Sequence, residues 1–199
     1  RDDHAWCTDR YDDDALEAVD CNPGSVYVLR TTDGGATYVE VAQLTAADAA
    51  SGDGFGYSVA IAGDTVAISG GGSVYIFRTT DGGGTWSQVA KLVTSDGVSI
   101  GGPAISGDVI VAGAAGDDSI ASNAGAVYVF RTTDGGATYG QVAKLTASDG
   151  AGGARFGGEG ARGGNTVVIG AYGENSFTGS VYVFRTGDGG ATYAQVAKL

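Results

Sequence analysis

The chain has 199 residues, which is enough for one sizeable β domain or for several small repeats. Its formal net charge is −12, which argues against a nucleic-acid backbone or an anionic membrane surface as the main partner. Apolar residues make up 43% of the chain, yet no apolar run approaches the roughly 20 residues that span a membrane, so we expect neither a disordered tract nor membrane insertion.

One stretch, of the form VYVFRTTDGGATYxQVAKL, occurs four times with small changes. The aspartates at the centres of the four copies follow one another at intervals of 48, 53 and 54 residues. A period near fifty, carried by residues typical of strands, indicates stacked β units such as propeller blades. The sequence therefore predicts an all-β fold, a single repeat domain over residues 1–199 with about four blades of four antiparallel strands.

The first blade, residues 1–44, is degenerate. Asp13–Val19 resembles a worn copy of the stretch GDTVAIS in the second unit, so the segment before the first clear strand can supply the two missing strands. Cys7 and Cys21 are equidistant from Asp14, and a hairpin turn at Asp12–Asp14 would bring them face to face, as a disulfide requires. The alternative is a disordered or capping arm. Because the chain has only these two cysteines, we expect a disulfide and an extracellular setting.

The second blade, residues 45–92, shows its four strands most clearly. They are expected at residues 57–62, 65–69, 73–78 and 86–92, separated by Gly-rich turns. The third of these strands is apolar on both faces, with Val74 and Ile76 on one and Tyr75 and Phe77 on the other. A strand of this kind must be covered on both sides, which neighbouring propeller blades provide.

The third and fourth blades, residues 93–145 and 146–199, follow the same plan. Phe156-Gly157 matches Phe55-Gly56 of the second blade, whereas the third blade has Ile100-Gly101 at that place. The pattern leaves open whether four blades close a ring or belong to a larger propeller.

A turn of the form Thr-x-Asp-x-Gly-x-Thr-aromatic joins the third and fourth strands of each blade. It fits the Asp-box pattern, in which the Asp side chain accepts backbone N–H bonds and the Gly permits a positive φ. The pattern predicts a structural role for the four turn aspartates, which are Asp33, Asp81, Asp134 and Asp188.

The Phe-Gly start, the GDTVxI strand, the GA-x-G-D/E stretch and the GSVYVF strand together resemble the FG-GAP repeat family over residues 25–199. That family includes the propeller heads of integrin α subunits. The resemblance implies an extracellular or cell-surface propeller for adhesion or recognition. The calcium loop of DxDxDG form is absent here, which places calcium binding of the integrin type in doubt.

The loops between the second and third strands and the loops between blades are expected on one face, where binding residues concentrate on a rigid scaffold. They collect several oxygen-bearing side chains, of which the candidates for a binding face are Asp53, Asp117, Asp118, Glu174 and Asn175. Such loops can ligate calcium, but the irregular spacing of the acids favours solvated acidic turns. The metal question therefore stays open.

No catalytic set is assignable, since the only histidine is His4 and no arginine cluster of the sialidase type is present. We expect a non-enzymatic scaffold that recognises a protein or a glycan. The alternative is a structural subunit that assembles with copies of itself into an extracellular filament or sheath.

Overall fold

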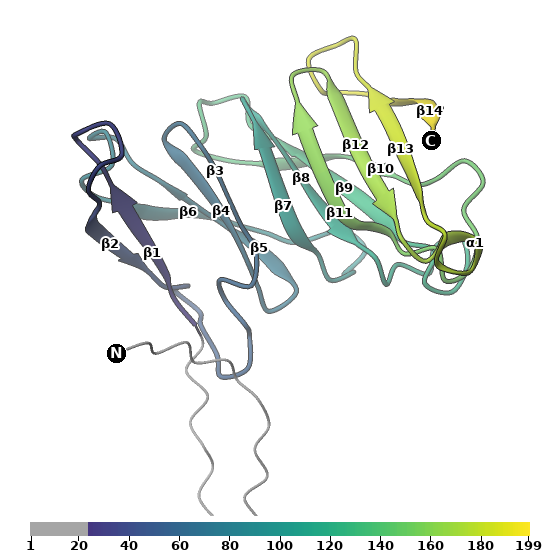
Figure 1. The fold of residues 1–199 in the computed structure, drawn as a ribbon, viewed down its shortest axis with the longest axis horizontal. Helices are drawn as coiled ribbons and strands as arrows, with labels where there is room; N and C mark the ends of the chain where they lie inside the picture. Colours follow the sequence, from purple (N-terminus) through teal and green to yellow (C-terminus); the bar gives the residue numbers. More distant parts are fainter. Residues whose placement is uncertain (1–23) are drawn as a thin grey trace, which may run out of the picture.

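The computed structural model describes residues 24–199, which form antiparallel β-sheets with one short helical turn (Figure 1). Cys7 and Cys21, and with them the expected disulfide, lie outside the described residues. The elements are β1 Val26–Arg30, β2 Val39–Leu44, β3 Val59–Ala62, β4 Thr65–Gly70, β5 Ser73–Arg78, β6 Ser87–Leu92, β7 Gly101–Ser106, β8 Val109–Ala114, β9 Ala126–Arg131, β10 Gly140–Leu145, β11 Phe156–Gly163, β12 Thr166–Ala171, α1 Glu174–Phe177, β13 Ser180–Arg185 and β14 Ala194–Lys198.

Three of the sheets in this part of the chain have four strands, each hydrogen-bonded in chain order: β3 to β6, β7 to β10 and β11 to β14. All their pairings are antiparallel. The first sheet has only β1 and β2 within residues 24–199. The prediction of an all-β fold built from four-stranded propeller blades is confirmed, and the four predicted strands of the second blade agree with β3 to β6 within two residues.

The hairpin between the first two strands of each complete blade depends on a glycine. Ala62 pairs with Thr65, so Gly63 and Asp64 alone make the turn. Gly63 has a φ of 55°, a conformation that L side chains rarely adopt but that glycine adopts without strain. A turn this short brings the two strands directly into register.

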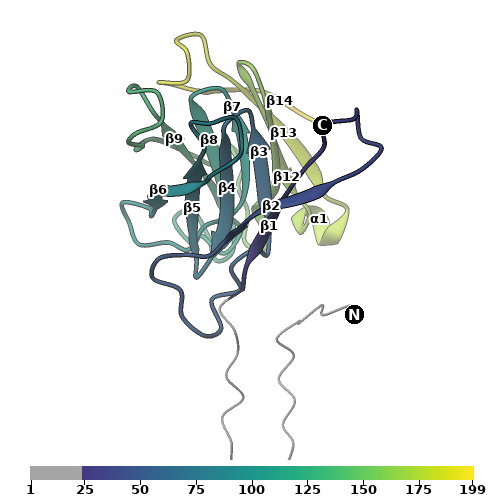
Figure 2. The ribbon, with the colours of Figure 1, turned by 90° about the vertical axis from the view of Figure 1, so that its left-hand side faces the viewer.

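The sheets stand side by side in an open row, with the first and last sheets at opposite ends (Figure 1). Viewed from the side of β1, they lie one behind another (Figure 2). The innermost strand of the third sheet, β7, packs against β3 on one side and β11 on the other. The row therefore corresponds to an arc of a propeller.

Three apolar cores fill the three junctions between successive sheets. Each core combines residues of two sheets; the core of the middle junction, for example, contains Val74 and Ile76 of β5 and Tyr128 and Phe130 of β9. Alternate side chains of β5 thus enter different cores, because Tyr75 packs toward the first sheet. The expectation that this strand is covered on both faces is confirmed.

The Phe-Gly pairs lie at these junctions. The Phe156 ring packs edge-on against Tyr182 and Phe184, with centroid separations of 5.3 and 5.9 Å. The backbone of Phe156 passes so close to Gly125 that a Cβ there would lie 2.1 Å from the Phe156 carbonyl oxygen. In the middle junction the buried Ile100 stands where the other two have phenylalanine. The Phe-Gly motif is therefore part of the packing between blades.

Candidate recognition surface

The two ends of the strands, which form opposite faces of the row of sheets, differ in character. The turns that contain the four predicted aspartates lie at one end of the strands, and the loops between second and third strands, with α1, lie at the other (Figure 1). We refer to the second end as the loop face.

At the first end, the turn aspartates are engaged within their own turns. Asp81 accepts hydrogen bonds from the backbone N–H groups of Gly84 and Thr85 at 2.8 and 2.9 Å, and from the Thr79 and Thr85 hydroxyls at 2.7 Å each. Asp33, Asp134 and Asp188 make the same kinds of contact with their own threonines. These donors favour the charged carboxylate and hold the pKa of each aspartate well below its usual range.

Arginines at this end connect neighbouring blades. Arg78, at the end of β5, donates from Nη1 to the carbonyl oxygen of Gly135 in the turn of the third sheet. Arg162, on β11, likewise donates to the carbonyl oxygen of Ser106. A shallow hollow of about 340 Å³ lies beside Arg78 and Asp134, and both of these side chains are hydrogen-bonded to the turn of the third sheet. This end of the molecule is therefore organised for cohesion between blades.

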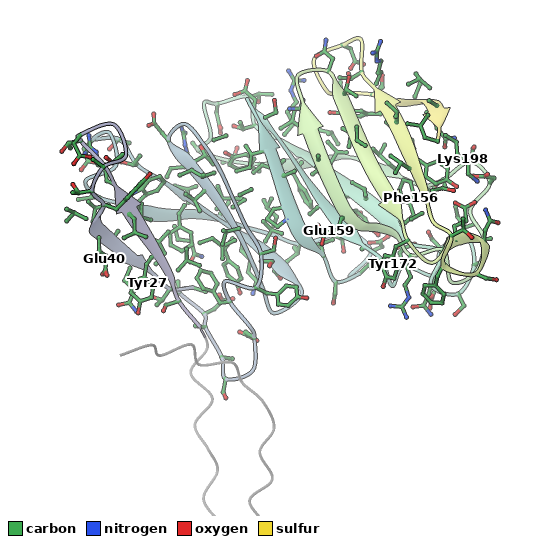
Figure 3. The ribbon with its side chains drawn as sticks, viewed as in Figure 1. Tyr27, Glu40, Phe156, Glu159, Tyr172 and Lys198 are labelled. Atoms are coloured by element: carbon green, nitrogen blue, oxygen red, sulfur yellow. The ribbon has the colours of Figure 1, made fainter. Side chains whose placement is uncertain are left out.

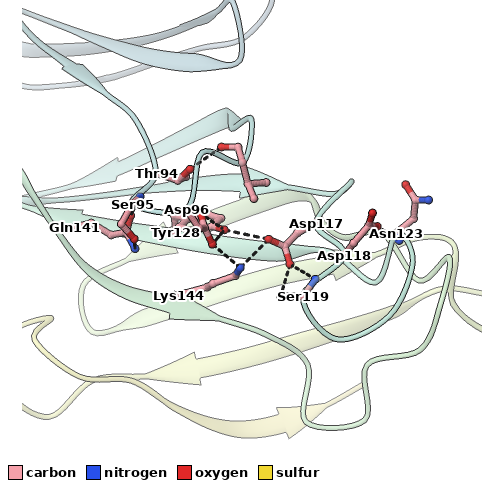
Figure 4. A network of polar contacts seen from close by, with 11 residues as sticks. Thr94, Ser95, Asp96, Asp117, Asp118, Ser119, Asn123, Tyr128, Gln141 and Lys144 are labelled. Carbon is pink, nitrogen blue, oxygen red and sulfur yellow. Dashed lines mark hydrogen bonds and ion pairs between the residues drawn. The ribbon is translucent and has the colours of Figure 1, made fainter.

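On the loop face, an ion-pair cluster ties the third sheet to the loop that precedes it (Figure 4). Lys144 Nζ lies 2.8 Å from Asp96 Oδ2 and 2.7 Å from Asp117 Oδ2. The Tyr128 hydroxyl lies 2.8 Å from Asp96 Oδ2 and 3.0 Å from Asp117 Oδ2. The Asp117 side chain is only 2% exposed, so its charge depends on Lys144 for compensation.

The fourth sheet has an equivalent cluster. Lys198 Nζ lies 2.5 Å from Asp149 Oδ2 and also pairs with Glu174. The Tyr182 hydroxyl donates to Asp149 Oδ1 and lies 2.8 Å from Glu174 Oε2. Each of these clusters therefore joins one acid from the loop between blades to another from the loop between second and third strands.

The second and first sheets hold reduced versions of the same arrangement. Lys91 pairs with Asp48 at 2.5 Å, and both side chains are substantially exposed. The loop Gly70–Gly72 carries no side-chain acid to complete a pair like that of Lys144. In the first sheet Gln43 occupies the lysine position and donates to the Tyr27 hydroxyl at 3.1 Å.

The electrostatics of the clusters keep every member in its usual ionisation state at neutral pH. Burial opposes ionisation of Asp117, but hydrogen bonds from Lys144 and Ser119 outweigh it, so the pKa of Asp117 is lowered. Burial also opposes the charge of Lys144, yet its bonds to Asp117 and Asp96 raise the pKa of Lys144. Burial raises the pKa of the Tyr128 hydroxyl.

These contacts separate the predicted loop-face residues rather than gathering them into one site. Asp117 and Glu174 are buried in different clusters. The exposed Asp118 accepts from the backbone N–H of Asn123, and Asp53 accepts from the N–H of Ala50 at 2.9 Å. Asn175 is exposed in α1. Residues 24–199 hold no group of three or more acidic, His or Cys side chains suited to a metal ion.

Sequence reasoning missed Asp48 and the lysines of the fourth strands. The signal was present, because the pattern Leu-x-x-x-Asp places an aspartate after the fourth strand of each of the first three blades, at Asp48, Asp96 and Asp149. The repeat shows that these aspartates occupy equivalent positions, but it does not show that each forms an ion pair with a lysine of the next blade.

An exposed aromatic pair distinguishes the loop face at the junction of the third and fourth sheets. Tyr172 and Phe177 are 49% and 74% exposed, and their ring centroids lie 6.4 Å apart at an interplanar angle of 33°. Arg155 Nη1 donates to the Tyr172 hydroxyl at 2.9 Å, with its guanidinium carbon 5.7 Å from the ring centroid. We call Arg155, Tyr172 and Phe177 the aromatic patch; Tyr172 is labelled in Figure 3.

Unusual backbone conformations occur beside this patch. Five non-glycine residues of the described chain have positive φ, between 49° and 69°, and all lie in the loops around it: Asn123, Arg155, Asn175, Ser176 and Phe177. The left-handed region costs about 1–2 kcal/mol for an ordinary L-residue. Strain of this kind concentrates at functional sites, where surrounding contacts hold it in place.

The FG-GAP repeat family model matches residues 38–77, 103–130 and 139–184, more than half of the chain. The chain belongs to the FG-GAP repeat family. The resemblance noted in the sequence is thereby confirmed, and such a family supplies a β-propeller scaffold for protein interaction.

Among solved structures, the chain resembles the crystal structure of Saccharomyces cerevisiae Sqt1, with 12% sequence identity and a TM-score of 0.44. The match covers 74% of this chain and 36% of that one, so this chain corresponds to about a third of the length of Sqt1. No curated protein matches the sequence. Within residues 24–199, no helix is both long and apolar enough to cross a membrane.

The lysine clusters predict unequal effects of one substitution at equivalent positions. Lys144→Met should lower the free energy of unfolding by about 2–4 kcal/mol, because it leaves the buried Asp117 without its counter-charge. Lys91→Met should cost clearly less, since its partner Asp48 is exposed to water. Urea unfolding of the two variants measures the difference, and equal losses would contradict a special role for the buried acid.

The lowered carboxylate pKa values predict acid sensitivity. The unfolded chain, with Asp pKa values of about 3.9, binds protons at a higher pH than the folded chain does. Stability should therefore be full above about pH 5 and fall as the pH drops through about 4 toward the lowered folded-state values. The carboxylates concerned are Asp33, Asp48, Asp81, Asp96, Asp117, Asp134, Asp149, Glu174 and Asp188. Thermal melts followed by circular dichroism from pH 7 to pH 3 should show a falling Tm; a constant Tm would refute the linkage.

Proposed function

We propose that this chain is a non-enzymatic extracellular β-propeller scaffold that recognises a protein or a glycan through its loop face. The observation that carries the proposal is the aromatic patch, an exposed pair of rings held by Arg155 on a strained loop. The extracellular setting is supported by the family and by the expectation of a Cys7–Cys21 bond.

The patch has the chemistry of a recognition surface. Tyrosine and phenylalanine offer large contact areas while losing little side-chain freedom, and aromatic and arginine residues dominate binding energy at interfaces. Asn123 and Asn175, exposed in the same loops, add amide donors and acceptors. The blades beneath supply a rigid support, as the preorganisation of a binding site requires.

The described charged groups favour a scaffold over an enzyme. The lysines and acids whose pKa values shift in residues 24–199 are engaged in the loop-face clusters and the turns between strands, where hydrogen-bonded partners account for the direction of each shift. The raised pKa values of the tyrosines come first from burial. Glu159, labelled in Figure 3, is exposed on the innermost strand β11. Arg162 of the same strand donates to the carbonyl oxygen of Ser106. These contacts support a role of the charged groups in holding the blades together rather than in catalysis.

The double variant Tyr172→Ser, Phe177→Ser tests the recognition role. Binding of the intact chain should be screened on an array of purified glycans and on a library of displayed peptides. We expect the double variant to lose at least about tenfold in affinity for the hits, because exposed aromatic residues carry most of the contact energy at such surfaces. Tyr57→Ser is the matched control, since Tyr57 is 85% exposed and lies outside the patch. Equal binding by all three proteins would contradict the assignment.

A second candidate function, self-assembly, is favoured by exposed apolar side chains on the first and last sheets of the row. Tyr27 and Leu29 of β1 are exposed, whereas Tyr75 and Phe77, at the equivalent positions of β5, are buried. At the other end Val168 of β12 is exposed, although Val111 of β8 is buried at the equivalent position. The exposed face of the last sheet is therefore equivalent to the faces that pack, inside the row, against faces equivalent to that of the first sheet. The last sheet of one copy can pack in the same way against the first sheet of another, and such head-to-tail contacts generate rings or filaments.

Assembly would make the size of the particles depend on Val168. Light scattering and electron microscopy of the chain should show oligomers that grow with concentration, and Val168→Asp should abolish them by placing a charge in the contact. Val196→Asp is the control, because Val196 is exposed on β14 just as Val89 and Val142 are on the fourth strands of the inner sheets. A monomer at all concentrations would exclude this second function.

A further inference from the structure

Arg155, in the aromatic patch, occupies a backbone position that suits a glycine. It precedes the pair Phe156-Gly157 just as Gly54 precedes the pair Phe55-Gly56 in the second blade. The φ angles of Arg155 and Gly54 are 55° and 61°, both in the left-handed region. Glycine adopts this region without strain, whereas an arginine is strained there. The arginine is therefore an addition to the blade that its backbone does not favour.

Tyr172 is a second addition at the same place. It directly follows the second strand of its blade, where the second and third blades have Gly71 and Ala115. The Tyr172 ring lies against the backbone of Gly158, on which a Cβ would be 2.8 Å from Tyr172 Cε1. Because the equivalent residues of the other two complete blades are small, the packing of a blade does not require the large side chain.

Backbone hydrogen bonds tie together the segments that carry the patch. The Arg155 N–H donates to the carbonyl oxygen of Asn123, and the Gly173 N–H donates to that of Ala154, at 3.0 Å each. The Arg155 side chain in turn donates to the Tyr172 hydroxyl. The patch is thus preorganised, so a ligand that binds there costs little conformational freedom of the protein.

Arg155 also differs in charge compensation from the lysines of the loop face. Lys91, Lys144 and Lys198 each pair with an acid. Arg155 forms no ion pair within residues 24–199, and its hydrogen bond from Nη1 to Tyr172 leaves the Nε and Nη2 edge of the guanidinium open. That edge presents two parallel N–H donors, which match the two oxygens of a carboxylate.

The surroundings of Arg155 narrow the class of ligand. The exposed rings of Tyr172 and Phe177 can cover the C–H face of a sugar, whose partly positive hydrogens complement the negative face of an aromatic ring. Asn123 and Asn175, exposed in the same loops, can exchange hydrogen bonds with sugar hydroxyls. A protein interface covers about 800 Å² on each side, far more than two rings and one arginine supply. The net charge of −12 repels a dense polyanion, so a single carboxylate fits better than a run of them.

We infer that the aromatic patch binds a sugar residue that carries a carboxylate, such as a uronic acid at the end of a glycan. The carboxylate lies on the open edge of Arg155, and the sugar ring lies over Tyr172 and Phe177. The inference rests on the proposed recognition function and narrows its ligand to an acidic sugar. Arg155 then distinguishes acidic from neutral sugars, whereas the two rings contact both.

Two ligands that differ at one carbon test the inference. Methyl β-glucuronide carries a carboxylate where methyl β-glucoside carries a CH2OH group, and NMR titration of the full chain at pH 7 measures both Kd values. The glucuronide should bind at least about tenfold more tightly, because the charge-assisted hydrogen bonds add to the ring contact. Arg155→Gln should remove this difference. Arg185→Gln should retain it, since Arg185 is an exposed arginine at the opposite end of the strands.

The variant Arg155→Gly separates binding from stability. Because Gly54 occupies the equivalent position, this variant should keep or raise the Tm while it abolishes the difference between the two sugars. A lower Tm with the difference intact would make Arg155 a packing residue and overturn the inference.

The other outcomes separate failure of this inference from failure of the recognition function. Equal binding of both sugars, lost in the Tyr172→Ser, Phe177→Ser double variant, would overturn the acidic sugar and keep the function. Tighter binding of the dipeptide N-acetyl-Phe-Asp-amide than of the glucuronide would assign the patch to a peptide and overturn the inference. No binding of the glucuronide would overturn it too, and the recognition function would then rest on the glycan and peptide screens.

Discussion

The structure depends on one constraint, which is that the third strand of each blade is apolar on both faces and is covered on both only where a neighbouring blade stands on each side. Tyr75 and Phe77 enter one core while Val74 and Ile76 enter the next, so no sheet completes its core alone. Each blade needs a neighbour on each side, and the row of blades follows from this requirement. The same constraint makes the exposed faces at the two ends of the row meaningful.

Polar contacts join neighbouring blades on both sides of the apolar cores. At one edge Arg78 and Arg162 reach backbone carbonyls of a neighbouring blade; at the other Lys144 and Lys198 reach an acid of the preceding loop. These contacts specify how one blade sits on the next, which burial alone does not. Through Asp117 and Glu174, the lysine clusters also hold the longer loops between second and third strands. The aromatic patch lies exposed beside these loops.

Much of the fold could be predicted from the sequence because the same pattern of strand and turn residues recurs in each repeat. The alternation in Ser73–Arg78 and the turn residues at Gly63 and Asp64 were sufficient for the complete blades. The site was less predictable. The contact of Lys144 with Asp96 joins residues of different blades, and periodicity marks equivalence rather than contact. The residues with left-handed backbone at Asn175–Phe177 are not glycines, so the sequence gives no signal for this turn. The helical turn α1 and the exposure of Phe177 could therefore not be predicted.

The short loop Gly70–Gly72 has a consequence for how the molecule comes apart. The loop supplies no acid, so Lys91, which reaches the exposed Asp48 across the junction between the first and second sheets, has no second acid to hold it. At the next two junctions the lysine that reaches the acid of the preceding loop is also held by a buried acid of its own blade. In an array whose cohesion is a sum over nearest neighbours, the weakest junction opens first. Heating or pulling should therefore peel the chain from its amino-terminal sheet inward, and the sheets that carry the aromatic patch should be the last to lose their shape.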